Sequence, residues 1–190
     1  MSNNKQSLSG KGLFPPKYAF TLLFPLRNIF LSPKKLIERL DLKEDHRVLE
    51  IGPGPGYFSV HVAKTLTKGK LVLADIQEEM LEYARKRLAA KNIQNIEFKL
   101  CDGHMLDFQD KSFDRVFMVT VIGEVTNKRE YVREIARILK DDGVLSVSEL
   151  AGDPDKLSTD ELRDLVCSEG FKEKEFFGSE WNYTMNFEKS

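Results

Sequence analysis

Short apolar runs rich in branched side chains alternate, from residue 47 onward, with longer segments whose apolar residues recur at helical spacing. The runs are apolar almost throughout, as strands covered on both faces must be, so the alternation predicts βα units that feed a mostly parallel sheet. We therefore expect an α/β fold built as a three-layer αβα sandwich. The predicted parallel strands are residues 47–51, 71–75, 96–100, 113–121 and 144–149.

Helix signals occupy the intervals around these strands. Ser32 offers a hydroxyl N-cap and Pro33 suits the first position of a helix that leads into the first strand. Gly170 is a typical stop for the last helix. The predicted helices are residues 34–40, 56–66, 77–91, 127–139 and 156–170.

The end of the chain changes pattern. Residues 171–178 and 181–188 each alternate between apolar and polar side chains, and Ser179 and Glu180 separate the two runs. Such a pair predicts an antiparallel β-hairpin. Added to the five parallel strands, it gives a mostly parallel seven-stranded sheet that ends in an antiparallel hairpin.

Composition fits one globular domain. The chain has 190 residues, of which 41% are hydrophobic and 31% charged, the usual proportions of a folded protein. We divide it into a leader, residues 1–31, and one domain, residues 32–190. Three prolines and an arginine interrupt the apolar part of the leader, so it lacks the continuous apolar segment of a signal peptide or a membrane span. We expect a cytoplasmic protein.

Charge and cysteine usage exclude further classes. A net charge of −1 and an isoelectric point near 6.3 provide no positive field for a phosphate backbone, which argues against nucleic acid as a partner. Cys101 and Cys167 lie far apart and form neither a C-x-x-C pair nor a cluster with the three histidines. We expect two reduced thiols and no metal site.

A glycine-rich loop follows the first predicted strand. Gly52, Gly54 and Gly56 stand where a missing β-carbon lets the backbone turn sharply and approach a ligand. Alone, this pattern also fits a tight turn between a strand and a helix. Glu50 lies inside the apolar strand that enters the loop, where a carboxylate needs a partner. A glutamate that reaches solvent or a backbone amide remains the alternative.

Two further positions favour a nucleotide-like ligand. Asp75 ends the second predicted strand, 23 residues after Gly52, where nucleotide-binding α/β folds place the carboxylate that binds ribose hydroxyls. It could instead cap the helix that begins near Gln77. Tyr57 stands where the third glycine of a G-x-G-x-x-G dinucleotide motif would fall, which weakens an NAD interpretation.

The segment Glu50-Ile-Gly-Pro-Gly-Pro-Gly56 resembles the E/D-x-G-x-G-x-G motif of class I S-adenosylmethionine-dependent methyltransferases. The resemblance extends from about residue 32 to the C-terminus and includes the terminal hairpin. It implies S-adenosyl-L-methionine as the cofactor. It also implies that the loop glycines and Glu50 lie near the methionine part of the cofactor, and that Asp75 binds its ribose.

The same resemblance assigns the other cofactor residues. Ile76 and Met80 would flank the adenine, while Asp102 would accept a hydrogen bond from the adenine amino group, with Gly103 beside the ring. The segment from Phe113 to Thr120 resembles the fourth strand of this family, whose end faces the sulfonium, and this places Thr120 near the cofactor. Residues 137–143 resemble the turn that precedes the fifth strand in this family.

The catalytic residues remain unknown at this stage, since the cofactor carries its own leaving group and the enzyme mainly has to align a nucleophile. His104 could act as a general base or only pack beside the adenine. Glu124 and Glu149, near the ends of the fourth and fifth strands, could face the pocket. Tyr18 in the leader could cover it, although packing is the simpler role.

The absence of two sequence motifs argues against a nucleic acid as the methyl acceptor. Residues 120–125 lack the N/D-P-P-Y/F motif of enzymes that methylate exocyclic amines of bases, and there is no Pro-Cys nucleophile. The apolar leader could cover the active site, pack on the domain or form a homodimer. We predict methyl transfer from S-adenosyl-L-methionine to a small, partly apolar molecule. The alternative is a protein that binds the cofactor without transferase activity.

Overall fold

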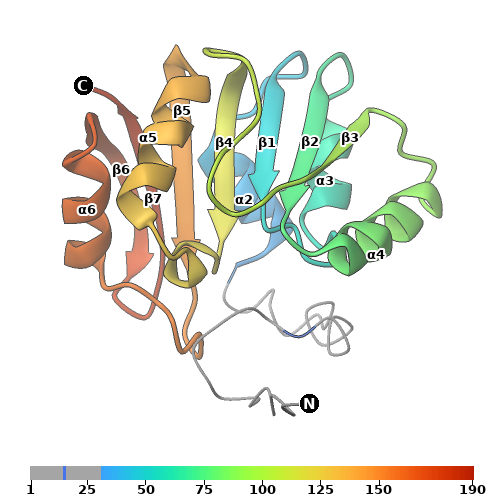
Figure 1. Cartoon of the computed structure of the whole chain (residues 1–190). Coiled ribbons are helices and arrows are strands. Elements are labelled where there is room, and N and C mark those ends of the chain that lie inside the picture. The colour runs from blue at the N-terminus through green and yellow to red at the C-terminus, as the bar shows by residue number, and fades with distance from the viewer. Residues whose placement is uncertain (1–14, 16–30) are drawn as a thin grey trace.

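The computed structural model describes residue 15 and residues 31–190. Seven strands form one sheet in the order β3-β2-β1-β4-β5-β7-β6 (Figure 1). Strands β1 to β5 run parallel, and β7 runs antiparallel to both β5 and β6. This confirms the predicted seven-stranded sheet with its terminal hairpin. The strands are β1 (Arg47–Ile51), β2 (Lys70–Asp75), β3 (Ile96–Leu100), β4 (Phe113–Val119), β5 (Leu139–Glu149), β6 (Phe171–Ser179) and β7 (Asn182–Lys189).

Helices cover both faces of the sheet, which confirms the three-layer α/β sandwich. Apolar residues of α2, α3 and α4 pack on one face, and those of α5 and α6 pack on the other. In Figure 1, α5 and α6 lie in front of the sheet, with α2 and α3 behind it. The helices are α2 (Pro33–Leu40), α3 (Ser59–Thr65), α4 (Glu78–Ala89), α5 (Lys128–Ile138) and α6 (Thr159–Cys167), with a 3₁₀ turn η2 at Ile122–Glu124.

The segment between β3 and β4 covers part of the α5 side of the sheet without a helix. Leu106 of this segment is buried in the core beside α5. The Arg137 guanidinium on α5 donates hydrogen bonds to the carbonyls of Leu106 at 2.7 Å and Phe108 at 2.8 Å. It also donates to the carboxylate of Asp110 at 2.6 Å. One arginine therefore holds a loop that would otherwise have few internal hydrogen bonds.

Side-chain caps set the starts of two helices. The Ser32 hydroxyl accepts a hydrogen bond from the amide of Lys35 at 3.3 Å, as its predicted role as N-cap requires. Ser158 and Glu161 form a reciprocal capping box, so α6 begins at Thr159, three residues later than predicted. Helix propensity alone does not place this boundary, whereas the cap does.

Two boundaries beside the glycine loop differ from prediction for one reason. The helix predicted from residue 56 begins at Ser59, because Gly56 has a φ of +78°. The strand predicted to residue 121 ends at Val119, because Thr120 has a φ of +57°. Neither value is compatible with a right-handed helix or an extended strand.

The prediction that a turn at residues 137–143 precedes the fifth strand was wrong. Helix α5 ends at Ile138, and β5 begins directly at Leu139, which pairs with Phe113. The pairing then shifts to Val144 opposite Arg115, so the extra residues of β5 form an irregularity within the strand.

The leader lies outside the described residues, except for positions 15 and 31, and so does Tyr18. Its role as an active-site cover and its part in a homodimer stay predictions. Leu31 is buried against the α2 side of the sheet. In the part of the chain that the structure describes, each helix is too short or too polar to cross a bilayer.

Candidate active site

The glycine loop after β1 lies at the edge of the sheet where the parallel strands have their carboxyl ends, the usual ligand site of an open α/β sheet. Gly52, Gly54 and Gly56 have φ angles of +64°, +53° and +78°, all in the region that L side chains rarely adopt. The three glycines are therefore required by the backbone path of the loop, as the sequence pattern predicted.

Close packing adds a second requirement at two of these positions. The amide of Gly52 donates to the carbonyl of Ala74 at 2.8 Å, and a β-carbon there would lie 2.6 Å from a methyl group of Val121. A β-carbon at Gly56 would lie 3.3 Å from that of Ala84 on α4. The loop is therefore wedged between α4 and the segment that follows β4.

Asp75 at the end of β2 faces this loop. Its carboxylate accepts hydrogen bonds from the amides of Gln77, at 3.0 Å, Ile76 and Gly54. Burial raises the pKa of Asp75, and these amide hydrogen bonds oppose that rise. Asp75 thus makes the bond to Gln77 that a helix-capping role requires, but it also contacts the glycine loop and remains partly exposed. The structure brings Asp75 and Gly54 together.

Glu50 lies in the interior of β1, between Leu73 of β2 and Phe117 of β4. It is only 3% exposed, so the alternative of a glutamate that reaches solvent is wrong. A buried carboxylate two residues before Gly52 is consistent with a role at the loop, which stays a prediction.

The residues predicted around the adenine divide into two groups. Ile76 is 40% exposed, and a β-carbon at Gly103 would lie 3.5 Å from its side chain, so these two are neighbours. Leu100 and Met105, on either side of Gly103 in the sequence, are also exposed. Met80, in contrast, lies on the buried face of α4.

Asp102 shapes the loop that follows β3. One carboxylate oxygen accepts hydrogen bonds from the amides of His104 at 2.8 Å and Met105 at 3.1 Å. These bonds hold the pKa of Asp102 below its ordinary value. Its second oxygen remains for the predicted contact with adenine. His104 is exposed on this loop.

Thr120 occupies a strained position directly after β4. A φ of +57° is rare for a β-branched residue. The amide of Thr120 donates to the carbonyl of Ser148 on β5 at 2.8 Å, and its hydroxyl donates to the carbonyl of Val119 at 2.7 Å. Backbone strain of this kind persists only where the surrounding structure holds the residue in place. Such residues are found most often at ligand sites.

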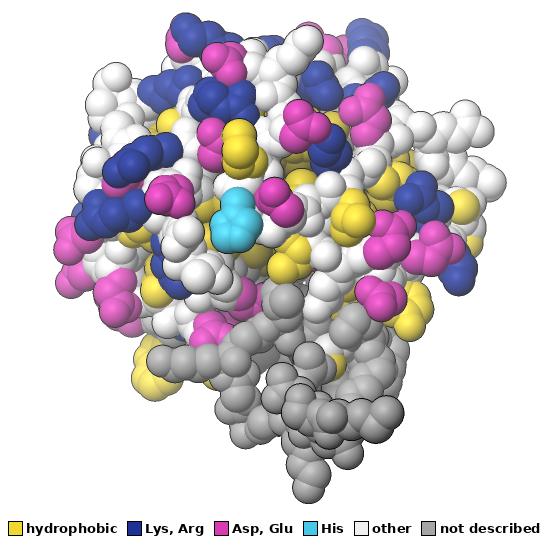
Figure 2. All heavy atoms as spheres, viewed as in Figure 1, with side chains coloured by type: hydrophobic (Ala, Val, Ile, Leu, Met, Phe, Trp, Pro, Cys, Tyr) yellow, Lys and Arg dark blue, Asp and Glu magenta, His cyan; other side chains and the backbone are white. Residues whose placement is uncertain are grey.

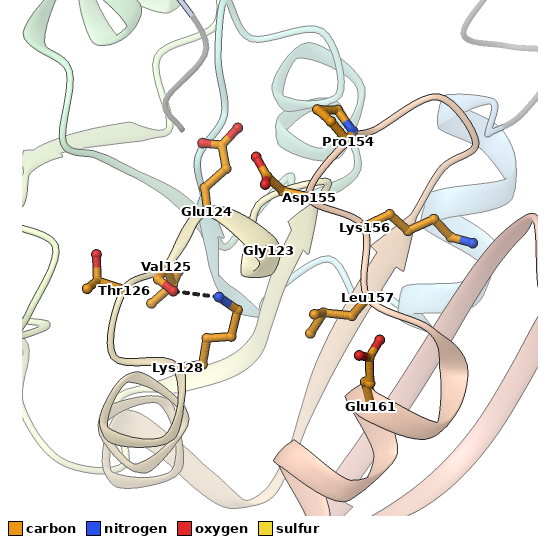
Figure 3. A pocket seen from close by; sticks show the side chains of 10 residues that line it. All are labelled: Gly123, Glu124, Val125, Thr126, Lys128, Pro154, Asp155, Lys156, Leu157 and Glu161. Atoms are coloured by element: carbon orange, nitrogen blue, oxygen red, sulfur yellow. Dashed lines mark hydrogen bonds between the residues drawn. The ribbon is translucent and has the colours of Figure 1, made fainter. Parts of the chain in front are cut away.

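A pocket of about 500 Å³ opens between the segments that follow β4 and β5 (Figure 3). The two segments approach each other closely at Gly123, where a β-carbon would collide with the carbonyl of Asp155. The lining mixes apolar side chains with charged ones. It consists of Gly123, Glu124, Val125, Thr126, Lys128, Pro154, Asp155, Lys156, Leu157 and Glu161.

Glu124 and Glu149 are the two carboxyl groups with strongly raised pKa values. Burial, together with the charges of Asp153, Asp155 and Asp75, raises the pKa of Glu124 to about 7. Burial raises the pKa of Glu149 to about 8, and the charges of Asp153 and Glu124 add to this. Glu124 lines the pocket, whereas Glu149 is fully buried.

The loop between β5 and α6 was not predicted to be part of the site, and its last three residues, 156–158, were expected in a helix. This loop contributes Pro154, Asp155 and Lys156 to the pocket. The Ser158 capping box and a proline between two aspartates were the available signals for a loop. Cys101 and Cys167 are free and half-buried, and no metal-binding group of three side chains occurs among the described residues.

A family model described as a methyltransferase domain matches residues 42–188. The chain belongs to the methyltransferase domain family. This membership implies S-adenosyl-L-methionine as the cofactor and confirms the resemblance found in the glycine loop.

Curated relatives of this methyltransferase domain share part of their length with it. The ubiquinone/menaquinone biosynthesis C-methyltransferase UbiE of Pseudomonas entomophila (strain L48) is 37% identical over 123 residues, which cover 64% of this chain and 48% of the relative. Methyltransferase GfsG of Streptomyces halstedii is 30% identical over 118 residues, 62% of this chain and 42% of the relative. The chain thus spans about half the length of the curated relatives it matches.

Solved structures share the fold of the methyltransferase domain. A SAM-dependent methyltransferase from Aquifex aeolicus superposes with a TM-score of 0.86 at 22% identity, over 92% of this chain and 98% of the other. A putative S-adenosyl-L-methionine-dependent methyltransferase from Methanococcus maripaludis superposes with a TM-score of 0.78 at 19% identity, over 100% of this chain and 97% of the other.

The residues present fit this cofactor. Gly52 and Gly54 allow a ligand to approach the backbone, Asp75 is a partly exposed carboxylate beside them, and Ile76 offers an exposed apolar surface next to Gly103. A sugar with two hydroxyl groups and a flat base match such donors and surfaces. The methyltransferase domain therefore has a suitable edge for the cofactor and a separate pocket beside it.

Proposed function

We propose that this domain transfers the methyl group of S-adenosyl-L-methionine to a small, partly apolar acceptor that binds in the pocket between the loops after β4 and β5. The observation that carries the proposal is the position of this pocket. Its wall begins at Gly123, directly after the segment in which Val121 contacts Gly52 of the glycine loop. A volume of about 500 Å³ suits a small molecule.

We propose the residue roles that the resemblance of the glycine loop implies. Glu50 and the glycines Gly52, Gly54 and Gly56 form the methionine end of the cofactor site, and Asp75 binds the ribose. Ile76, Met80, Asp102 and Gly103 form the adenine end, and Thr120 lies where the two sites meet. The cofactor supplies a methyl group on a positively charged sulfur, so the chain has to align the acceptor and exclude water.

Surface charge supports a small molecule over a nucleic acid. On the face shown in Figure 2, basic and acidic side chains are interspersed among the described residues and form no broad basic area. A nucleic acid would be bound mainly through such an area. The names of the UbiE relatives, which refer to ubiquinone and menaquinone biosynthesis, also support a small-molecule acceptor.

Calorimetric titration with S-adenosyl-L-methionine and S-adenosylhomocysteine tests the first part of the proposal. We expect both to bind, and no binding at high micromolar concentration would contradict it. Release of S-adenosylhomocysteine with a panel of small acceptors tests the second part. Binding without product formation across the panel would favour a cofactor-binding protein without transferase activity.

A further inference from the structure

Positive charge is concentrated at the start of the chain. The first 37 residues contain six lysines and arginines and no aspartate or glutamate. The remaining 153 residues contain 23 basic and 30 acidic side chains, so a segment of charge +6 precedes a body of charge −7. Such segregation indicates an interaction with a negatively charged partner, which the overall charge of −1 conceals.

The same basic segment, residues 1–37, is rich in large apolar side chains. Residues 13–31 contain 11 of them, five of which are aromatic, and Lys17 and Arg27 lie among them. This mixture suits the interface of a bilayer, where apolar side chains enter the headgroup region and cations meet anionic lipids. A nucleic acid offers the negative charge but no apolar phase, so the composition favours a lipid surface.

Helix α2 attaches the basic segment to the carboxyl edge of the sheet, where the parallel strands end. At the other end of α2, the carbonyls of Leu40 and Asp41 accept hydrogen bonds from Arg115, near the start of β4. Figure 1 accordingly shows the chain entering α2 from the carboxyl edge, at the bottom of the sheet. Lys34 and Lys35 in the first turn of α2 are exposed, so the basic segment continues onto the described domain.

The carboxyl edge also carries exposed apolar side chains. Six large apolar side chains are exposed among the described residues. Ile76 is assigned to the adenine and Tyr83 belongs to α4, but the other four lie at or near the carboxyl edge. They are Leu100 at the end of β3, Met105 in the loop after it, Phe176 near the end of β6 and Trp181 in the turn after β6. Exposed apolar side chains that gather on one side of a molecule mark a contact with a protein or a membrane.

Trp181 is 74% exposed and is the single tryptophan of the chain. Its turn lies at the carboxyl edge, because Tyr183 at the start of β7 pairs with Glu149, the last residue of β5. Tryptophan is enriched where proteins meet the interface of a membrane.

The exposed apolar side chains span the whole sheet. Leu100 ends β3 and Trp181 follows β6, and these two strands are the outer strands of the sheet. Six strand spacings separate them, roughly 29 Å at the usual distance between strands. A partner with an extended, flat surface reaches both points at once, whereas a small ligand does not.

We propose that this domain docks on an anionic lipid surface, with the carboxyl edge of the sheet facing the lipid. The basic segment supplies the attraction, because the edge itself also carries carboxylates such as Asp75 and Asp102. Docking in this orientation places the proposed acceptor pocket, which opens between the segments after β4 and β5, beside the bilayer. The docking does not depend on methyl transfer.

Trp181 makes the inference measurable in the full chain, because its fluorescence reports on the carboxyl edge alone. We expect its emission to shift to shorter wavelength when phosphatidylcholine vesicles with about 30% phosphatidylserine are added, and brominated lipid to quench it. Sedimentation with the same vesicles should show binding about tenfold or more tighter than to pure phosphatidylcholine. Salt at about 0.5 M should weaken this binding, because it screens the charges.

A pair of double variants separates the charge of the basic segment from the total charge. Lys17→Gln/Arg27→Gln should weaken binding to the anionic vesicles about tenfold. Lys64→Gln/Lys91→Gln is the matched control, since it removes the same charge from exposed sites at the ends of α3 and α4, on the opposite edge of the sheet. This control should change vesicle binding by less than about twofold, because the charges lie far from the lipid.

Moving the tryptophan tests the orientation. In Trp181→Phe/Lys91→Trp the reporter lies on the edge that should face away from the lipid. The variant should bind the same vesicles, with no shift and no quenching of its emission. An equal shift from both tryptophan positions would overturn the proposed orientation.

The inference is overturned if anionic vesicles leave the emission of Trp181 unchanged, if neutral and anionic vesicles bind equally, or if the two double variants behave alike. Binding to a DNA duplex without binding to vesicles would identify a nucleic acid as the partner instead. Trp181 emission that is already at short wavelength without lipid, together with no vesicle binding, would show that the basic segment covers its own domain. Titration with S-adenosylhomocysteine needs no lipid, so its failure would contradict the proposed function and leave the docking unaffected.

Discussion

Replacing Gly52 by alanine should damage the glycine loop in two separable ways. At a φ of +64°, an L residue costs about 1–2 kcal/mol relative to glycine. The new β-carbon would also lie 2.6 Å from a methyl group of Val121, and overpacking of this kind costs about 1–3 kcal/mol. We therefore expect a loss of about 2–5 kcal/mol in the free energy of unfolding.

Gly152→Ala is the control for the backbone contribution alone. Gly152 has a φ of +89°, and a β-carbon there would meet no atom within 4 Å. The double variant Gly52→Ala/Val121→Ala isolates the contact, because the nearest remaining atom, the β-carbon of residue 121, lies at 3.5 Å. Relative to Val121→Ala alone, adding Gly52→Ala should cost only the backbone contribution.

Urea denaturation at matched m-values measures these differences, and titration with S-adenosylhomocysteine measures the effect on the loop's ligand. Gly52→Ala should lose both stability and affinity, whereas Gly152→Ala should lose about 1–2 kcal/mol of stability and no affinity. The reasoning is refuted if Gly52→Ala is as mild as Gly152→Ala, or if removing the Val121 methyl groups leaves the effect of Gly52→Ala unchanged.

Three further predictions concern single residues. Asp75→Asn should weaken the binding of S-adenosylhomocysteine by about 1.5–3 kcal/mol, because the ribose would lose a charged acceptor, and calorimetry that shows unchanged affinity would remove Asp75 from the site. Ser158→Ala removes the capping box of α6 and should lower the free energy of unfolding by about 1 kcal/mol in urea, with no change in cofactor affinity. Burial raises the pKa of Glu149 from 4.5 to about 8, so the folded protein retains a proton that the unfolded chain releases. The stability contributed by this group is therefore complete below about pH 4.5 and decreases up to about pH 8, and Glu149→Gln should flatten that slope in denaturation measured across the interval. Parallel slopes in both proteins would contradict it.

The sheet could be predicted because its strands are buried on both faces and appear in the sequence as uninterrupted apolar runs. The first strand, Arg47–Ile51, was predicted with its observed bounds for this reason. The errors lie where a backbone angle decides the outcome, as at Gly56 and Thr120, whose positive φ values exclude them from the predicted helix and the predicted strand. The early start of β5 at Leu139 escaped prediction because its pairing with Phe113 is a tertiary contact.

Part of the candidate site could be predicted from the sequence, and part of it could not. The glycine loop and Asp75 have fixed spacing along the chain, so the sequence indicates them directly. The sequence does not indicate the pocket, because the pocket depends on the close approach of Gly123 to the Asp155 carbonyl. These two residues belong to segments that are distant in sequence. The raised pKa of Glu124 likewise arises only when carboxylates from different loops come together.

The terminal hairpin is attached to the pocket, although none of its residues lines it. The amide of Ala151 donates to Asn182 at 2.8 Å, and the hydroxyl of Thr159 donates to the carboxylate of Glu180, also at 2.8 Å. Tyr183 donates to Leu157 from the same hairpin. A screen for loss of activity would therefore score substitutions in the hairpin turn as damage to the proposed acceptor pocket. Libraries intended to change acceptor choice should include these supporting positions as well as the pocket wall.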